Sequence, residues 1–435
     1  MATDLEEIRA AGDVILSRAE VVNTSGFGQD ISNQISGIQV YESLFDPFIT
    51  GVLIVDDTLD LINLFPLVGE EFLNLSIRTP TLERLDDGTS RTITGKFYIY
   101  KISEREYIGD KRLSYKLHFI SFEALVDLNK KLSLPFNGKC SDIAKNIVTS
   151  ERGLESKKRV YVEESANSIK FVSNFWSPVK CLNYVSERAV NYKDSPTYYF
   201  YENRNGFNFG SLQNLAVQNP VQTFTYDAYS RDFNSNGQSI KNVEEEYKRV
   251  RDISVPVVYD YMDRIRSGTY TSKLITHDLA TKQYNVRTFS MLNSFDKETT
   301  LNQNPISSSK NIAFPDAALM TKPLCNFNFT GYGDVTTSDK ALKRVSRINQ
   351  FRSNAIEIVV PGRTDYTVGQ RVTVIFYKNT PLAAGEDIRD HIDKIYTGTY
   401  LISAINHYVS RKEHECNLEL IKDSYIVDLD EGGLI

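Results

Sequence analysis

Histidine and cysteine side chains can ligate a metal ion, and cysteine can also act as a nucleophile. No HExxH pair occurs, and no Cys and His pattern has the spacing of a zinc site. His407 and His414 flank a predicted hairpin, where we expect solvated polar residues at a turn. We therefore predict no metal site and no cofactor. The histidines are His118, His277, His391, His407 and His414, and the cysteines, expected to be reduced thiols without a CxxC pair, are Cys140, Cys181, Cys325 and Cys416.

Catalytic sequence motifs are also missing. The chain has no GxSxG nucleophile elbow, no GxxxxGK[ST] phosphate loop and no GxGxxG pattern. The acidic loop Gly385–Asp393 could offer carboxylates to a cation, but its mixed charges favour a solvated loop. We predict no catalytic residues and no enzyme activity. The paired carboxylates of a glycosidase need no fixed spacing, so a β-rich glycan-binding or glycan-cleaving protein is the alternative function.

Length and charge narrow the function classes. A chain of 435 residues exceeds a single comfortable core, so two to four domains are expected. The net charge of -6, without a long run of Lys or Arg, argues against binding nucleic acid through its phosphates. No stretch approaches the roughly 20 apolar residues of a membrane helix. The N-terminus lacks the pattern of a signal peptide, so we expect synthesis in the cytoplasm and no membrane insertion.

The elements that would position any site are predicted to be β-strands. One stretch of these strands is repeated elsewhere in the sequence. Val368–Ile421 reads Val-Gly, a strand, a polar loop, Thr-Gly, a strand ending in Ile, a loop and a closing strand. Val68–Ile120 has the same order and punctuation. Three strands in the same order, with matching turn residues (Val-Gly and Thr-Gly) before the first two, indicate a duplicated domain.

The duplication extends upstream. Ile35–Glu42 is echoed by Ile253–Asp260, and each is followed by a Gly and an apolar strand that ends at Asp56 or Asp278. A long segment then separates the two parts of the second copy, so an insertion is expected there. The predicted domains are 1–125, the first β-barrel; 126–220, an α/β module; 221–290, the start of the second β-barrel; 291–337, the insertion; 338–425, a helix and the rest of the second barrel; and 426–435, an acidic tail.

Residues 126–220 change from strand to mixed patterns. Ser141–Val148 has a Ser cap and helical apolar spacing, and a second helix starts at Ser177-Pro178 and continues through Val190. Two aromatic-rich strands flank the turn Asn203–Gly206, which is a good hairpin signal. The fold class is therefore mainly β with α+β parts: two duplicated antiparallel β-barrel (tube-like) domains, an α/β module and an insertion in the second barrel.

These barrels, together with Ser177–Val185, Tyr198–Tyr201 and Phe207, carry a family resemblance. The chain resembles the central baseplate hub protein of T-even-type contractile-tailed phages, which shares its fold with the hub part of type VI secretion spike proteins. It departs from that family by a longer loop, Lys378–Tyr396. No β-helical repeat follows Ile435, so we expect no fusion of hub and needle.

The resemblance implies a structural protein of the virion, located in the tail baseplate. It implies a homotrimer whose six barrel domains form a pseudo-sixfold ring that continues the tail tube. The expected partners are the trimeric, cell-puncturing spike protein, the tail tube or its initiator, and other baseplate proteins. DNA would pass through the lumen without specific binding, and the family is not enzymatic.

Strand periodicity then assigns faces to the duplicated strands. We predict one row facing the barrel cores and the opposite row available for the ring interface or the lumen. The core row is Leu73, Leu75, Ile77, Val372, Val374 and Phe376; the interface or lumen row is Asn74, Ser76, Arg78, Arg371, Thr373 and Tyr377. The one basic element, the predicted helix Ser338–Ser353, should lie outside the lumen against an acidic neighbour or solvent; the alternative is an ordinary solvated face.

Overall fold

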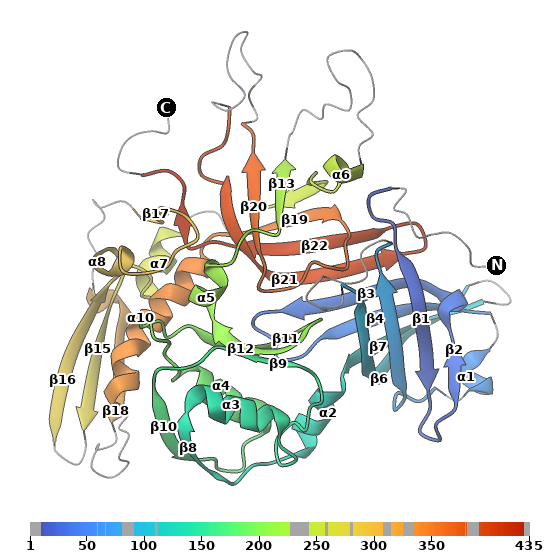
Figure 1. Cartoon of the computed structure of the whole chain (residues 1–435), viewed down its shortest axis with the longest axis horizontal. Coiled ribbons are helices and arrows are strands. Elements are labelled where there is room, and N and C mark those ends of the chain that lie inside the picture. The colour runs from blue at the N-terminus through green and yellow to red at the C-terminus, as the bar shows by residue number, and fades with distance from the viewer. Residues whose placement is uncertain are drawn as a thin grey trace.

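Most strands in the described part of the chain join one continuous sheet of 13 strands, which runs through two halves of the molecule (Figure 1). Among the residues described by the computed structural model, no helix is long and apolar enough to cross a membrane. Cys325, most of the loop 378–396 and the end of the acidic tail 426–435 lie outside these residues. The described residues are 10–58, 60–65, 67–80, 91–108, 112–226, 243–256, 260–278, 282–307, 315–324, 335–378, 380 and 391–429.

The first half is an antiparallel array in the order β3-β4-β7-β6-β5-β1-β2. Its apolar rows enclose one core, to which Leu53, Leu75 and Phe119 belong. A short helix, α1 (Leu61–Leu64), follows β4. The strands are β1 (Ile15–Val22), β2 (Gly28–Asp30), β3 (Ile35–Ser43), β4 (Thr50–Asp57), β5 (Phe72–Arg78), β6 (Ile93–Ile108) and β7 (Arg112–Ser121).

The second half repeats this pairing order as β14-β19-β22-β21-β20-β13, which matches β3-β4-β7-β6-β5-β1. One difference is that β13 runs parallel to β20, whereas β1 is antiparallel to β5. A short helix, α6 (Val243–Glu246), precedes β14. The strands are β13 (Gln222–Tyr226), β14 (Asp252–Ser254), β19 (Ala355–Pro361), β20 (Arg371–Phe376), β21 (Gly398–Ser410) and β22 (His414–Ile421).

The repeated glycines have matching structural roles. Gly69 and Gly369 both have positive φ, 92° and 85°, a conformation that favours glycine at the turn into β5 and β20. In the strands that follow, Gly95 lies opposite the buried Leu75, and Gly398 lies opposite the buried Val374. The repeated punctuation of the sequence therefore reflects a repeated turn and a repeated register.

The two halves are joined edge to edge rather than separated as two independent barrels. Strand β21 pairs with β22 on one side and with β3 of the first half on the other. Val409, at the end of β21, packs into the core of the first half. This pairing makes the halves one sheet with two cores.

The assignment of Thr271–Asp278 to the second barrel is wrong. This strand, β15, pairs with β16 and β18 in a separate three-stranded sheet, on which helix α10 packs. The strand equivalent to β4 is β19, so the insertion begins directly after β14 and ends at α10. Its elements are α7 (Tyr261–Arg266), β15 (Thr271–Asp278), β16 (Gln283–Ser290), α8 (Met291–Phe295), β17 (Asn304–Pro305), β18 (Leu319–Leu324) and α10 (Val335–Arg352); β17 pairs with β23 (Ser424–Tyr425) after β22.

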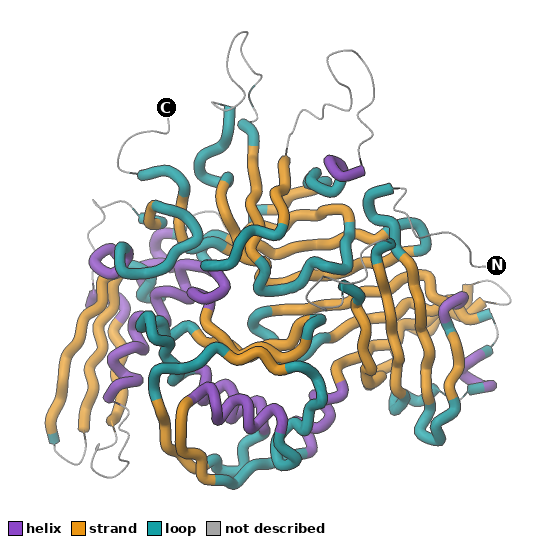
Figure 2. Tube along the Cα trace, in the orientation of Figure 1, coloured by secondary structure: helices purple, strands orange, loops and turns teal. Residues whose placement is uncertain are grey.

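The α/β module, which lies between the halves in the chain, combines helices with short strands (Figure 2). It has its own hydrophobic core. Ser177 caps α4 by accepting a hydrogen bond from the Lys180 backbone N–H, and Pro178 occupies the first turn. This helix ends at Ser186, short of the predicted Val190. The elements are α2 (Phe122–Asn129), β8 (Pro135–Lys139), α3 (Cys140–Thr149), β9 (Val160–Val162), β10 (Ser168–Val172), α4 (Pro178–Ser186), β11 (Tyr198–Asn203), β12 (Gly206–Ser211) and α5 (Leu212–Ala216).

Candidate functional site

The strands β5 and β20 present two faces, as period-2 alternation requires. Leu73, Ile77, Val372 and the other residues of the predicted core row are buried, with exposed fractions of 5% or less. The opposite row is half-buried in both strands. The six buried side chains are Leu73, Leu75, Ile77, Val372, Val374 and Phe376.

The opposite row differs between the halves. On β5, Asn74 donates to Glu20 at 3.0 Å and Ser76 contacts Thr94 at 3.1 Å, so these groups form a polar surface layer that includes Arg78. On β20, Arg371 donates to the backbone oxygens of Ala216 and Gln218, each at 3.1 Å. Arg371 therefore fastens the segment that leads into β13. The other two members also face neighbouring segments: Thr373 lies between Thr223 and Thr399, and Tyr377 bridges to Ile392.

A second polar surface, which we call the junction face, covers the strands where the halves meet. It is the solvent-facing side of β3, β14, β19, β21 and β22, and none of these strands contains Lys or Arg. Glu357 lies opposite Glu419 across β19 and β22, and Asn406 lies opposite Asn417 across β21 and β22. Arg251, just before β14, pairs with Glu413 and Glu415 at 2.8 and 2.7 Å. The junction face is therefore acidic and amide-rich.

The equivalent strands of the first half do not share this acidity. Lys96 and Lys101 lie on β6, and Lys116 of β7 pairs with Glu104. The acidic character belongs to the second half and to β3.

Glu42 joins three parts of the chain on the buried side of β3. Its carboxylate accepts hydrogen bonds from the backbone N–H of Arg204, in the β11–β12 turn, at 3.0 Å. It also accepts from the Thr367 hydroxyl and, at 3.3 Å, from the Val368 N–H before β20. Burial raises the pKa of Glu42 to about 7, against the opposing effect of Thr367 and of the positive Arg204.

The predicted basic helix is α10, and its charges are paired inside the chain. Lys340 pairs with Asp194 of the α/β module at 2.6 Å, and Lys343 pairs with Glu298 of the insertion at 2.7 Å. Arg347, only 2% exposed, pairs with Asp423 after β22 at 2.7 Å. Because Arg347 is buried and Lys343 is largely buried in these pairs, the alternative of an ordinary solvated face is wrong. The helix therefore connects the α/β module, the insertion and the segment after β22. The position of α10 outside a lumen stays a prediction.

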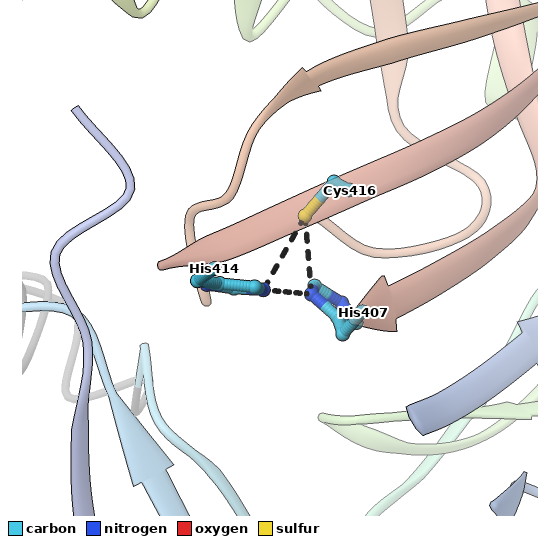
Figure 3. A group of neighbouring side chains, drawn as sticks. All are labelled: His407, His414 and Cys416. Carbon is cyan, nitrogen blue, oxygen red and sulfur yellow. Dashed lines mark hydrogen bonds between the residues drawn. The ribbon is translucent and has the colours of Figure 1, made fainter. Parts of the chain in front are cut away.

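His407 and His414 are fully buried, so the expectation of solvated turn residues is wrong. In the β21–β22 hairpin His407 lies opposite Cys416, and His414 precedes Cys416 by two residues on the same face. Figure 3 shows the three side chains converging. His407 Nδ1 lies 3.1 Å from His414 Nε2, and Cys416 Sγ lies 3.3 and 3.5 Å from these nitrogens.

The protonation of this cluster follows from its burial. Burial, assisted by the neighbouring His414, holds the pKa of His407 well below its usual range, with the Tyr366 backbone acting in the opposite direction. Burial lowers the pKa of His414 to about 3 and raises the pKa of the Cys416 thiol. Both imidazoles are therefore neutral, which is the form that binds metals.

Sequence patterns contained a signal for this cluster that linear motifs did not capture. A four-residue turn, Ser410–Glu413, makes His407 and Cys416 cross-strand partners, and alternation puts His414 beside them. The acidic junction face could also have been predicted from the sequence, because the five strands that form it contain no Lys or Arg. The pairings of α10 with Asp194 and Asp423 join residues distant in sequence and left no local pattern.

Comparison with known proteins identifies the fold. No protein-family model and no curated protein sequence matches the chain. The tail protein from Neisseria meningitidis MC58 matches with a TM-score of 0.54 and 10% identity, over 93% of this chain and 96% of that chain. The 43 kDa tail protein of prophage MuSo2 from Shewanella oneidensis matches with a TM-score of 0.51 and 11% identity, over 93% and 98%.

A weaker match is the c3393 protein of E. coli, described as a component of the type VI secretion system. Its TM-score is 0.43 at 8% identity, over 94% of this chain and 76% of that chain. The two tail proteins match over nearly their whole length and over nearly the whole of this chain. The chain therefore has the fold of phage tail proteins.

Proposed function

We propose that this chain is the structural hub of a contractile phage tail baseplate. In this role it is a homotrimer that adapts a trimeric spike to the sixfold tail tube and surrounds the path of the DNA. Its place is the virion, and its role is assembly rather than catalysis.

The observation that carries this proposal is the duplicated strand order within a chain that has a tail-protein fold. A trimer of a chain with two equivalent halves presents six equivalent units around its axis. Closed rotational symmetry is the rule for homo-oligomers. Such a trimer can therefore meet a threefold spike at one end and a sixfold tube at the other without a second adaptor.

The junction face supports the conduit part of the proposal. DNA binds proteins largely through Lys and Arg contacts to phosphate, each of which adds affinity by releasing counterions. A wall without these residues lets DNA pass without holding it. The strands of the junction face lack them, whereas Lys96, Lys101 and Lys116 lie on the equivalent strands of the first half, so this property belongs to the second half and β3. We place this face toward the lumen, and we assign the polar row Asn74, Ser76 and Arg78 to contacts with a neighbouring subunit.

The remaining partners are the spike trimer on one face of the ring, the tail tube or its initiator on the other, and further baseplate proteins around the rim. Exposed apolar side chains provide surface for such contacts. Phe27, Tyr107, Phe175 and Tyr284 are each at least 71% exposed.

Light scattering coupled to size-exclusion chromatography tests the oligomer directly. A homotrimer has a mass of three times 49.5 kDa. A monomer at micromolar concentration would argue against the hub. A duplex DNA titration at physiological salt tests the conduit: we expect no retention, and tight salt-sensitive binding by the trimer would refute a passive channel.

A further inference from the structure

The His407, His414 and Cys416 cluster has the dimensions of a metal site. In a tetrahedral zinc site with Zn–N near 2.05 Å and Zn–S near 2.3 Å, neighbouring ligands stand about 3.3 Å (N to N) and about 3.6 Å (N to S) apart. The observed separations are 3.1 Å between the nitrogens and 3.3 and 3.5 Å from the sulfur to each nitrogen. One ion above the triangle can therefore reach all three atoms.

A hydrogen-bonded triangle explains these contacts less well. An imidazole nitrogen directs its proton or lone pair along one line in the ring plane, so it cannot point at two partners at once. Each of the three atoms has two close neighbours here. A single cation satisfies all three atoms, and neutral imidazole and thiolate sulfur are ligands that zinc prefers.

The surrounding backbone holds the ligands in place. The His414 N–H donates to Gly12 O at 2.8 Å, and the Gly362 N–H donates to His414 O at 2.7 Å. Gly362 packs so closely on the His414 imidazole that a Cβ there would lie 2.2 Å from the ring. The position is therefore restricted to glycine by the histidine ring.

The cluster also lies next to the strand pairing that joins the two halves of the molecule. His407 lies opposite Val40 of β3, in the pairing that connects the second half to the first. Cys416 lies opposite Val360 of β19. An ion bound to this hairpin would cross-link the strands that carry the connection, and ligands from β21 and β22 would fix their register.

We propose that His407 Nδ1, His414 Nε2 and Cys416 Sγ form a structural zinc site that locks the β21–β22 hairpin where the two halves join. The Cys416 thiol loses its proton to solvent as the Zn–S bond forms, which leaves a net charge of +1 on the bound unit. Structural zinc sites usually have four protein ligands; here three protein ligands leave the fourth tetrahedral position to a small ligand such as water.

Metal analysis of the full chain, purified without a metal-affinity tag, tests this site. Elemental analysis should find one zinc ion per chain. After chelation, Co²⁺ should restore a thiolate-to-cobalt charge-transfer band and the intense visible bands of tetrahedral cobalt. Re-addition of zinc should raise the Tm, because an ion that binds only the folded chain stabilises it.

The matched variants are Cys416→Ser and Cys181→Ser, each of which changes a buried cysteine. Cys416→Ser should lose the zinc, the charge-transfer band and the zinc-dependent rise in Tm, whereas Cys181→Ser should keep all three. The cobalt spectrum of the unmutated chain does not depend on any variant folding. Absence of the charge-transfer band in that chain, an unchanged band in Cys416→Ser, or copper retained in place of zinc would overturn the assignment.

Discussion

Replacing Glu42 by Gln should remove a pH-dependent weakness at the meeting point of three parts of the chain. The buried carboxyl has a pKa of about 7 in the folded chain, against a usual value of 4.5. Between these values the folded chain holds a proton that the unfolded chain has released, so stability falls as the pH rises through this window. The difference between these two pKa values corresponds to roughly 3 kcal/mol of the free energy of unfolding, which is fully lost above pH 7.

The amide of Glu42→Gln resembles the protonated acid. Its oxygen can accept from the Arg204 N–H, and its nitrogen can donate to the Thr367 hydroxyl. The Val368 N–H loses its acceptor, which costs the variant the same amount at every pH. Urea unfolding of both proteins from pH 4.5 to pH 8 gives the difference in the free energy of unfolding at each pH. The free energy of unfolding of the variant, relative to that of the wild type, should rise by about 3 kcal/mol from pH 4.5 to pH 8. Glu357→Gln, at an exposed position of the junction face, is the control and should show no such trend.

A difference between Glu42→Gln and the wild type that stays constant with pH would refute this reasoning. It would mean that the carboxyl is ionised throughout, stabilised by Arg204 more strongly than burial destabilises it. If the stability of the variant relative to the wild type rose as the pH fell, the pH trend would be opposite to the expected one and would contradict the argument that burial raises the pKa.

Two further substitutions test the packing. Val374→Asp should unfold the second half, because an unpaired charge in its core costs several kcal/mol, while Thr373→Asp should remain folded by circular dichroism; the opposite result would mean that the faces of β20 are reversed. Arg347→Met should destabilise the chain by about 3–5 kcal/mol in urea unfolding, because Asp423 is left buried and unpaired. The double variant with Asp423→Asn should recover much of that loss, and an equal loss in both variants would show that the pair is not coupled.

The duplication could be predicted because its punctuation has a local physical cause. Gly69 and Gly369 mark turns that need positive φ, and strand alternation fixes which side of β5 and β20 is buried. Both signals lie within a few residues of the feature they predict. The α/β hairpin was predicted for the same reason, since its Asn-Gly turn is local.

The features that sequence patterns missed depend on contacts between distant segments. The alternation of β15 shows that one face is buried, but it cannot tell whether α10 or a barrel core covers that face. The pairing of β3 with β21 joins residues more than 360 positions apart. The burial of His407 and His414 was missed because it depends on Gly12 and Gly362, which belong to other segments.

An image of the purified protein viewed down its symmetry axis tests the central proposal most directly. Class averages by electron microscopy should show a ring of three copies with six similar lobes around an axial opening, one lobe for each half. A monomer, a dimer, or a trimer with three lobes and no opening would contradict the assignment of this chain as a tail hub.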